Sequence, residues 1–330
     1  VRLRGLESQG MEIGDAYFGP YICSFPKCIL QMAAQGGYAF LDGTVITPGC
    51  DSMRRLDECW RKVGQDYPGT LPDFFFFYGV PHKTAPHGLL WFAEETRRLI
   101  QAVEAHFAVQ VTPERLARAI EDYNQGRRLL GRLEALRSAR RTVLTGVEAF
   151  AAQIAGTVMP RPEYNRLLEA LISGAEGRPS LAEGKKRLML IGSVADDVGL
   201  IRMIEEAGAV VVAESLCFGP RRGGEEVRLT GDPVADLAEF YLSRSVCPRM
   251  FGAYRERLTL MRDKIARASV DGVVMQNIRF CDLHGSENGL FERDLEADGV
   301  PCLKIEREYG PLVETGRMRM RLDAFLERLA

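Results

Sequence analysis

Three cysteines in this sequence follow apolar segments that have the length of β-strands: Cys50, Cys217 and Cys281. The clearest case is 271–284, where an apolar run ends at Cys281 and His284 follows three residues later. In parallel α/β sheets, functional groups gather where strands end at their carboxyl edge. Thiolates at such positions bind soft metals, so we interpret these three thiols as ligands of one shared iron–sulfur cluster.

The chain has eight cysteines, and six of them are expected in loops. These six candidate metal ligands are Cys23, Cys28, Cys50, Cys217, Cys247 and Cys281. Cys59 and Cys302 are expected inside a helix and a strand, as structural residues. A structural zinc site would need paired ligands close in sequence, whereas most of these cysteines stand one to a loop. The alternative that each is simply a buried apolar residue stays open.

Four further residues have side chains that could act beside such a cluster. His82 and His284 both follow predicted strand ends, so either could donate a proton there, or be an ordinary surface histidine. Arg221 and Arg222 follow Cys217 closely and would either face an anionic coenzyme tail or face solvent. The sequence does not separate these alternatives.

The glycine-containing turns do not match known nucleotide-binding motifs. Gly192–Gly199 follows a predicted strand and opens a helix, and Glu214 ends the next strand, where a ribose-binding acid would stand. However, the G-x-G-x-x-G spacing is absent, which favours a plain turn. The P-loop spacing is absent around Gly184–Lys186 as well. We therefore expect no ATP site in this chain.

Composition limits the classes of partner. The 330 residues carry a formal charge of −2 with a pI near 6.2, so no basic face argues for nucleic acid. No apolar run approaches the roughly 18 residues of a membrane span. Eight cysteines without a secretion signal argue against a disulfide scaffold and for a cytoplasmic location.

The pattern of apolar segments divides the chain into three parts. Residues 1–85 and 186–330 alternate predicted strands and helices, which is typical of an α/β fold with parallel sheets. Residues 86–185 form a helical segment that ends in a glycine-rich linker. The chain begins at Val1 without a methionine, so we expect the N-terminal α/β domain, 1–85, to be truncated.

Seven segments together are similar to the 2-hydroxyacyl-CoA dehydratase and benzoyl-CoA reductase family. The resemblance extends over nearly the whole chain, and its motifs are specific in combination. The segments are 23–25, 41–51, 213–221, 246–250, 279–282, 300–310 and 316–327.

This resemblance implies an iron–sulfur subunit with two Rossmann- or flavodoxin-like domains. Such a subunit pairs with a homologous subunit, as a homodimer or heterodimer, and receives electrons from an ATP-hydrolysing iron–sulfur activator protein. In members with one cluster, a [4Fe-4S] cluster is bound by three cysteines, which match Cys23, Cys50 and Cys281 here. In double-cubane members the cluster is [8Fe-9S], and Cys28, Cys217 and Cys247 would be the additional ligands.

We therefore expect this chain to be a subunit of an ATP-dependent low-potential reductase that acts on an acyl-CoA. The benzoyl-CoA reductase type is the favoured one. The Glu306–Tyr309 segment and the number of thiols favour that type. The alternatives are an (R)-2-hydroxyacyl-CoA dehydratase subunit, which acts through a ketyl radical, and a double-cubane reductase of small molecules. Two alternatives lie outside this class of enzyme. One is a non-catalytic partner subunit, and the other is a nucleotide-binding protein with buried cysteines.

Overall fold

The computed structural model describes residues 1–219, 223–313 and 315–329, and about half of the chain is helical. The chain forms two compact units. Unit 1 comprises residues 1–2, 122–226 and 253–330, and unit 2 comprises residues 3–121 and 227–252. Both contain parallel strands, which confirms the predicted α/β class. The three-part division drawn from the sequence stays a prediction.

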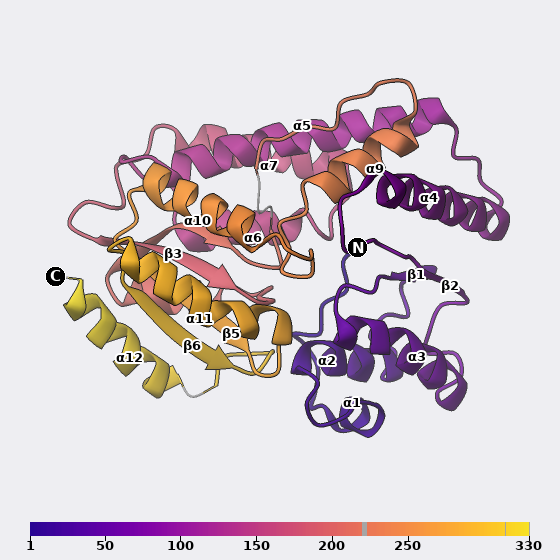
Figure 1. Ribbon diagram of the computed structural model, residues 1–330, viewed down its shortest axis with the longest axis horizontal. Coiled ribbons are helices and arrows are strands. Elements are labelled where there is room, and N and C mark those ends of the chain that lie inside the picture. The colour runs from indigo at the N-terminus through magenta and orange to yellow at the C-terminus, as the bar shows by residue number, and fades with distance from the viewer. Residues whose placement is uncertain (220–222, 314, 330) are drawn as a thin grey trace. The chain divides into compact units, whose positions relative to one another are not determined.

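The core of unit 1 is a four-stranded parallel sheet, visible in Figure 1. Its order is β4-β3-β5-β6, with parallel pairing throughout. Continuous apolar runs fill the middle of β3, β4 and β5, and β4 is buried along its whole length, as expected for a sheet covered on both faces. The edge strand β6 alternates buried and more exposed residues. The bounds are β3 (Lys186–Gly192), β4 (Ala209–Ser215), β5 (Gly272–Ile278) and β6 (Cys302–Arg307).

Four helices connect or follow these strands. In Figure 1, α10 and α11 lie along one face of the sheet, and a right-handed crossover from β3 to β4 requires α8 on the other. The last helix, α12, contacts β6. An added Cβ at Gly272 of β5 would approach Phe325 of α12 to 2.8 Å, so this helix packs closely on the sheet. The bounds are α8 (Gly199–Glu206), α10 (Tyr254–Ala268), α11 (Asp282–Ala297) and α12 (Thr315–Arg328).

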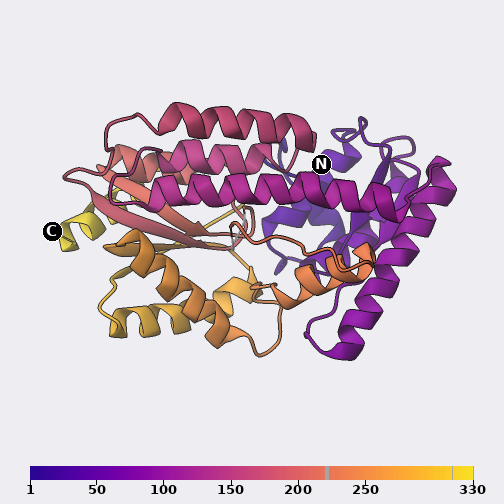
Figure 2. The same cartoon turned by 90° about the horizontal axis from the view of Figure 1, so that it is seen from above.

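Three further helices of unit 1 pack together, as Figure 2 shows, and one of them, α6, contacts β4. They are α5 (Pro113–Ser138), whose residues from 122 onward belong to this unit, α6 (Gly146–Ala155) and α7 (Arg161–Ala175). A capping box of Thr145 and Glu148 begins α6. Gly146 lies directly on Val211 of β4, where an added Cβ would come within 2.7 Å of its side chain.

Unit 2 has a much smaller sheet, the parallel pair β1 (Gly43–Ile46) and β2 (Phe74–Phe77). Its core comes mainly from helices, with Leu30, Leu56 and Trp60 fully or almost fully buried. The helices are α1 (Glu12–Tyr17), α2 (Ser24–Ala34), α3 (Asp51–Asp66), α4 (Pro86–Phe107) and α9 (Pro233–Ser243). Within the described residues, no helix is long and apolar enough to span a membrane.

Candidate functional site

Three cysteines occupy the same local position, the N-cap of a helix. Cys23 precedes α2, Cys50 precedes α3 and Cys281 precedes α11. Cys50 has extended backbone, and Asp51 begins the first turn of α3. The partial positive charge at a helix N-terminus stabilises a thiolate. These are also the three cysteines that the family resemblance implies as ligands.

The Cys50 corner, residues 46–54, lies in unit 2. β1 ends at Ile46, the Gly49 amide donates to the Thr47 carbonyl at 2.8 Å, and Cys50 then begins α3. The thiol of Cys23 donates to the Ser52 hydroxyl over 4.0 Å. Since Ser52 belongs to the first turn of α3, Cys23 lies close to the helix end that Cys50 caps. Unit 2 thus brings two of the predicted ligands together.

The Cys281 corner, residues 278–285, lies in unit 1. β5 ends at Ile278, whose carbonyl accepts from the Cys281 amide at 2.9 Å. Between them Phe280 has φ 63°, in the left-handed region. That conformation costs a non-glycine residue about 1–2 kcal/mol, and such strain persists where surrounding structure imposes it, often at functional sites. The corner therefore presents Cys281 through a strained turn.

The segment after β6 lies beside this turn. The Arg279 amide donates to the Arg307 carbonyl at 2.9 Å, continuing the β5–β6 pairing. The Arg279 guanidinium pairs with Glu306 at 3.3 Å and with Glu308 at 3.5 Å. These ion pairs are exposed and each contributes little.

A buried polar network lies beneath the same segment. Arg307 donates from Nε to Gln276 Oε1 at 2.9 Å and from Nη2 to Asp197 Oδ2 at 3.2 Å. Tyr309 donates to Asp196 Oδ2 at 2.6 Å. All of these side chains lie at the carboxyl end of the sheet. The Glu306–Tyr309 segment, which had favoured the reductase type, therefore has a structural role in supporting the Cys281 corner.

One predicted proton donor meets one predicted ligand in unit 1. His284 Nε2 lies 3.3 Å from Cys217 Sγ, which connects α11 with the loop after β4. His284 is only 9% exposed. The other candidate, His82, is an exposed residue of unit 2, in the loop after β2. Arg221 and Arg222 lie outside the described residues.

The remaining cysteines differ in their surroundings. Cys28 lies inside α2 and is buried, so its predicted loop position is wrong: the helix already begins at Ser24. Cys59 and Cys302 lie inside α3 and at the start of β6, as predicted. Burial raises the pKa of Cys302 to about 12, which makes its thiolate inaccessible near neutral pH. Cys247 lies in the loop between α9 and α10.

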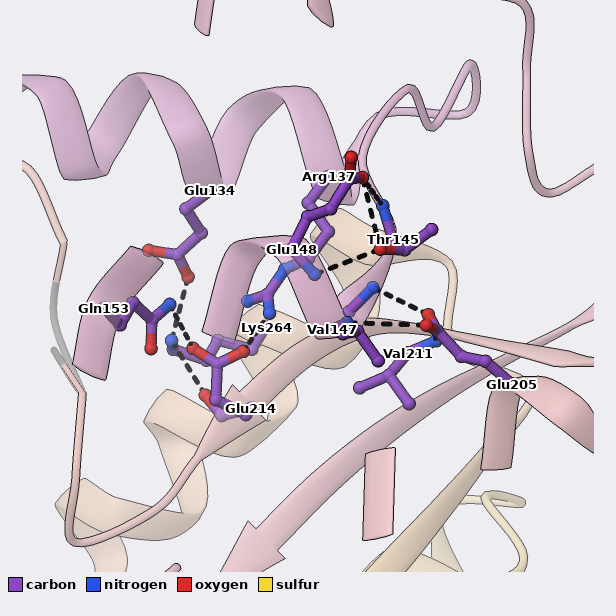
Figure 3. Close-up of polar contacts among 11 residues, drawn as sticks. Glu134, Arg137, Thr145, Val147, Glu148, Gln153, Glu205, Val211, Glu214 and Lys264 are labelled. Carbon is purple, nitrogen blue, oxygen red and sulfur yellow. Dashed lines mark hydrogen bonds and ion pairs between the residues drawn. The ribbon is translucent and has the colours of Figure 1, made fainter. Parts of the chain in front are cut away.

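Glu214 proves to belong to a buried ionic cluster (Figure 3). Its carboxylate forms an ion pair with the fully buried Arg137 and accepts from Gln153 Nε2 at 2.8 Å. Lys264 donates to the Glu214 carbonyl at 3.2 Å and to Glu134 at 2.8 Å. Burial alone would raise the pKa of Glu214, but Arg137 and Lys264 hold it below its usual value. The carboxylate serves packing of unit 1 and is not placed to bind a ribose.

All eight cysteines are thiols rather than half-cystines. Among the described residues, no three His, Cys, Asp or Glu side chains are grouped as a metal site. The thiols at the three helix N-termini are nevertheless of the soft donor type that an iron–sulfur cluster takes.

Two residues of unit 2 were not assigned by sequence reasoning. They are Ser52, which contacts Cys23, and Arg249, which the sequence showed only as part of the 246–250 segment. The position of Ser52 next to a helix cap was a usable signal. Arg249 offered none beyond its proximity in sequence to Cys247.

Residues 1–329 match the family described as 2-hydroxyglutaryl-CoA dehydratase, D-component. A benzoyl-CoA reductase subunit of Thauera aromatica is 24% identical over 296 residues, 88% of this chain and 74% of the relative. The (R)-phenyllactyl-CoA dehydratase beta subunit of Clostridium sporogenes is 24% identical over 330 residues, 98% and 86% of the two chains. The (R)-2-hydroxyglutaryl-CoA dehydratase beta subunit of Acidaminococcus fermentans is 18% identical over 319 residues, 95% and 82%.

Proposed function

Because the chain belongs to the 2-hydroxyglutaryl-CoA dehydratase D-component family, we propose that it is the iron–sulfur, substrate-side subunit of an ATP-dependent low-potential enzyme acting on an acyl-CoA. We propose the benzoyl-CoA reductase type, with two Rossmann- or flavodoxin-like domains. The relatives themselves are divided between a reductase and dehydratases. Membership of the family is common to reductases and dehydratases, so the choice of a reductase is a more specific proposal than membership alone.

The observation that carries this proposal is the shared position of Cys23, Cys50 and Cys281 at helix N-termini. In the described part of the chain no other cysteine is an N-cap. These positions favour the thiolate that iron requires. We assign these three residues as ligands of a [4Fe-4S] cluster.

The cluster, when bound, supplies single electrons at low potential to the thioester substrate. Protein-bound clusters reach about −700 mV at the lowest, so reduction of an aromatic thioester needs additional driving force. No ATP-binding motif was found in the sequence, and we propose that a separate ATP-hydrolysing iron–sulfur activator supplies it. Three relatives are named as subunits, which supports a homologous subunit as a second partner.

Within this proposal His284 is the favoured proton donor, because it is buried beside Cys217 near the end of α11 that Cys281 caps. His82 remains a second candidate. A double-cubane cluster would require further thiols. Cys217 and Cys247 are partly exposed and suit that role better than Cys28, which is buried inside α2.

The second candidate function is an (R)-2-hydroxyacyl-CoA dehydratase subunit, favoured by the high coverage of the dehydratase beta subunits. Both functions use the same cluster and activator. They differ in substrate: a reductase consumes two electrons for each product, whereas a dehydratase returns its electron and requires only a catalytic supply.

The test begins with protein purified without oxygen together with its partner subunit, in which iron and acid-labile sulfide are measured per chain. About four irons support the single cubane and about eight the double cubane. Benzoyl-CoA and a 2-hydroxyacyl-CoA are then each supplied with activator, ATP and reductant. Stoichiometric consumption of reductant with benzoyl-CoA supports the reductase. Dehydration of the hydroxyacyl thioester with catalytic reductant supports the dehydratase, and absence of iron overturns both.

A further inference from the structure

Arg249 joins two segments of unit 2 that are far apart in sequence. It lies in the loop between α9 and α10, two residues after Cys247. Its Nη2 donates to the Val80 carbonyl at 2.6 Å and to the Pro81 carbonyl at 3.1 Å. Val80 and Pro81 belong to the loop after β2. The position of the guanidinium is therefore fixed by two main-chain acceptors.

The β1–β2 pairing places this guanidinium at the edge where Cys50 lies. Because β1 and β2 are parallel and Ile46 pairs with Phe77, the loops after both strands leave the same edge. Cys50 belongs to the first loop, and the acceptors of Arg249 belong to the second.

One donor of this guanidinium is unsatisfied. Arg249 Nε is buried and has no hydrogen-bond partner among the described residues. A buried donor without an acceptor costs about 1–3 kcal/mol, more when it is charged. An acceptor at this place would recover that cost. Cysteine thiolates and the sulfides of an iron–sulfur cluster are such acceptors, and hydrogen bonds to these sulfurs raise the reduction potential.

We propose that Arg249 contributes a hydrogen-bond donor and a fixed positive charge to the iron–sulfur cluster that Cys50 helps to hold. This inference rests on the proposed function, because it requires a cluster at Cys50. A cation stabilises the reduced, more negative form of the cluster. The guanidinium is already oriented by Val80 and Pro81, so little ordering is needed when the cluster binds. Arg249 would thereby ease electron transfer from the activator to this subunit.

The loops do not depend on Arg249 alone, so it can be replaced without separating them. The Phe251 amide donates to the His82 carbonyl at 2.9 Å, and Lys83 Nζ lies 4.7 Å from the centre of the Phe251 ring. These contacts connect the same two segments and remain in an Arg249 variant. A neutral variant should therefore fold.

The experiment compares Arg249→Gln, which removes the charge, with Arg249→Lys, which keeps it. Arg97→Gln is the matched control, since Arg97 is an exposed arginine of unit 2 paired with Asp232. Each full-length protein is purified without oxygen, its iron is counted, and its cluster is titrated with a low-potential reductant while EPR follows the reduced form. The titration reports the potential, which a merely structural role would leave unchanged.

We expect Arg249→Gln to weaken reduction about tenfold, a shift of about 59 mV to more negative potential for a one-electron couple. Arg249→Lys should keep most of the wild-type potential, and Arg97→Gln all of it. If Arg249→Gln and wild type both contain full iron and have equal reduction potentials, the inference about Arg249 is overturned, while the proposed function stands. Loss of iron from both Arg249 variants overturns it too, because the residue would then be structural. A wild-type protein without iron overturns the proposed function, and the inference with it.

Discussion

The Cys50 corner and the Cys281 corner repeat one arrangement with different support. In each, a parallel strand ends, a short turn follows, and a cysteine caps a helix. The Cys281 corner follows β5, a seven-residue strand with partners on both sides. The Cys50 corner follows β1, which has four residues and one partner, and whose Val45 is 43% exposed.

The difference shows two ways to fix a thiol at a helix N-terminus. In unit 1 the sheet is broad enough to impose a left-handed conformation on Phe280 and to bury the Arg307 network beneath it. A two-stranded sheet is only marginally stable by itself. In unit 2 the corner and the neighbouring loop are therefore fixed by side chains from other segments, with Cys23 on Ser52 and Arg249 on the carbonyls of Val80 and Pro81.

The two tryptophans make the comparison measurable. Trp60 and Trp91 are the only tryptophans of the sequence, and both belong to unit 2. Tryptophan fluorescence therefore reports on unit 2. The far-UV circular dichroism signal, in contrast, also contains the contribution of unit 1 with its four-stranded sheet. The contrast between the corners leads to four expected outcomes, taken in order of decreasing effect.

The largest effect is expected when either cysteine is removed. Cys281→Ala and Cys50→Ala should each reduce the iron per chain at least about tenfold, since even changes outside the ligand shell cost about 10–100-fold in metal affinity. Iron analysis of protein purified without oxygen measures this. Cys302→Ala is the control and should retain the iron. If only one corner proves sensitive, the two do not share a cluster, and equal iron in all three variants contradicts the ligand assignment.

The buried hydrogen bonds of Arg307, beneath the Cys281 corner, should contribute more to the stability of the protein than the exposed ion pairs do. Arg307→Met leaves Asp197 and Gln276 without their buried partner, so the free energy of unfolding should fall by about 3–5 kcal/mol. Urea unfolding followed by circular dichroism measures this change. Arg293→Met, which removes an exposed arginine paired with Asp294, should cost less than about 1 kcal/mol. Equal costs for the two variants would show that the network is not a support.

The turns before the two cysteines should respond oppositely to glycine. Phe280→Gly should be more stable than Phe280→Ala by about 1 kcal/mol, because only glycine adopts φ 63° without strain. Gly49 is not in the left-handed region, and an added Cβ would meet only Met53 at 3.9 Å. Gly49→Ala should therefore stabilise the protein by about 0.4–1 kcal/mol. Urea unfolding measures both changes, followed by circular dichroism for the Phe280 variants and by tryptophan fluorescence for Gly49→Ala. A Gly49→Ala variant less stable than wild type would contradict the prediction for the Cys50 corner.

The exposed ion pairs of the Cys281 corner should matter least. Arg279→Ala removes its pairs with Glu306 and Glu308, all three at least 39% exposed, and should cost no more than about 1 kcal/mol. About 1 M salt should remove the difference from wild type, because it shortens the screening length to about 3 Å. Urea unfolding at low and high salt measures both effects. A cost that persists in high salt would instead point to the main-chain pairing of Arg279.

Much of the local structure was predictable because it depends on residues close in sequence. Uninterrupted apolar runs predicted β3, β4 and β5, and helical spacing predicted α10 with the bounds that the structure has, Tyr254–Ala268. The positions of Cys50, Cys217 and Cys281 after strands followed from the same runs. Periodic burial and short-range turn chemistry are sufficient for such features.

The start of α11 was not predictable in the same way. The residues predict a helix only over 290–298, whereas the helix begins at Asp282, directly after Cys281. Gly285, Asn288 and Gly289 have low helix propensity, so this stretch does not resemble a helix by itself. Burial of Phe291 and Leu295 overrides that propensity. The cap position of Cys281 was missed for this reason.

By itself the sequence determined the strand–helix alternation of the chain and the thiols that follow its strands. Only the tertiary structure decided which side chains support those thiols. The hydrogen bonds from Arg249 to Val80 and Pro81, and from Arg307 to Gln276 and Asp197, join residues far apart in sequence. Such pairings leave no periodic pattern in the sequence, because they depend on the path of the backbone and on which loops leave the same edge of a sheet.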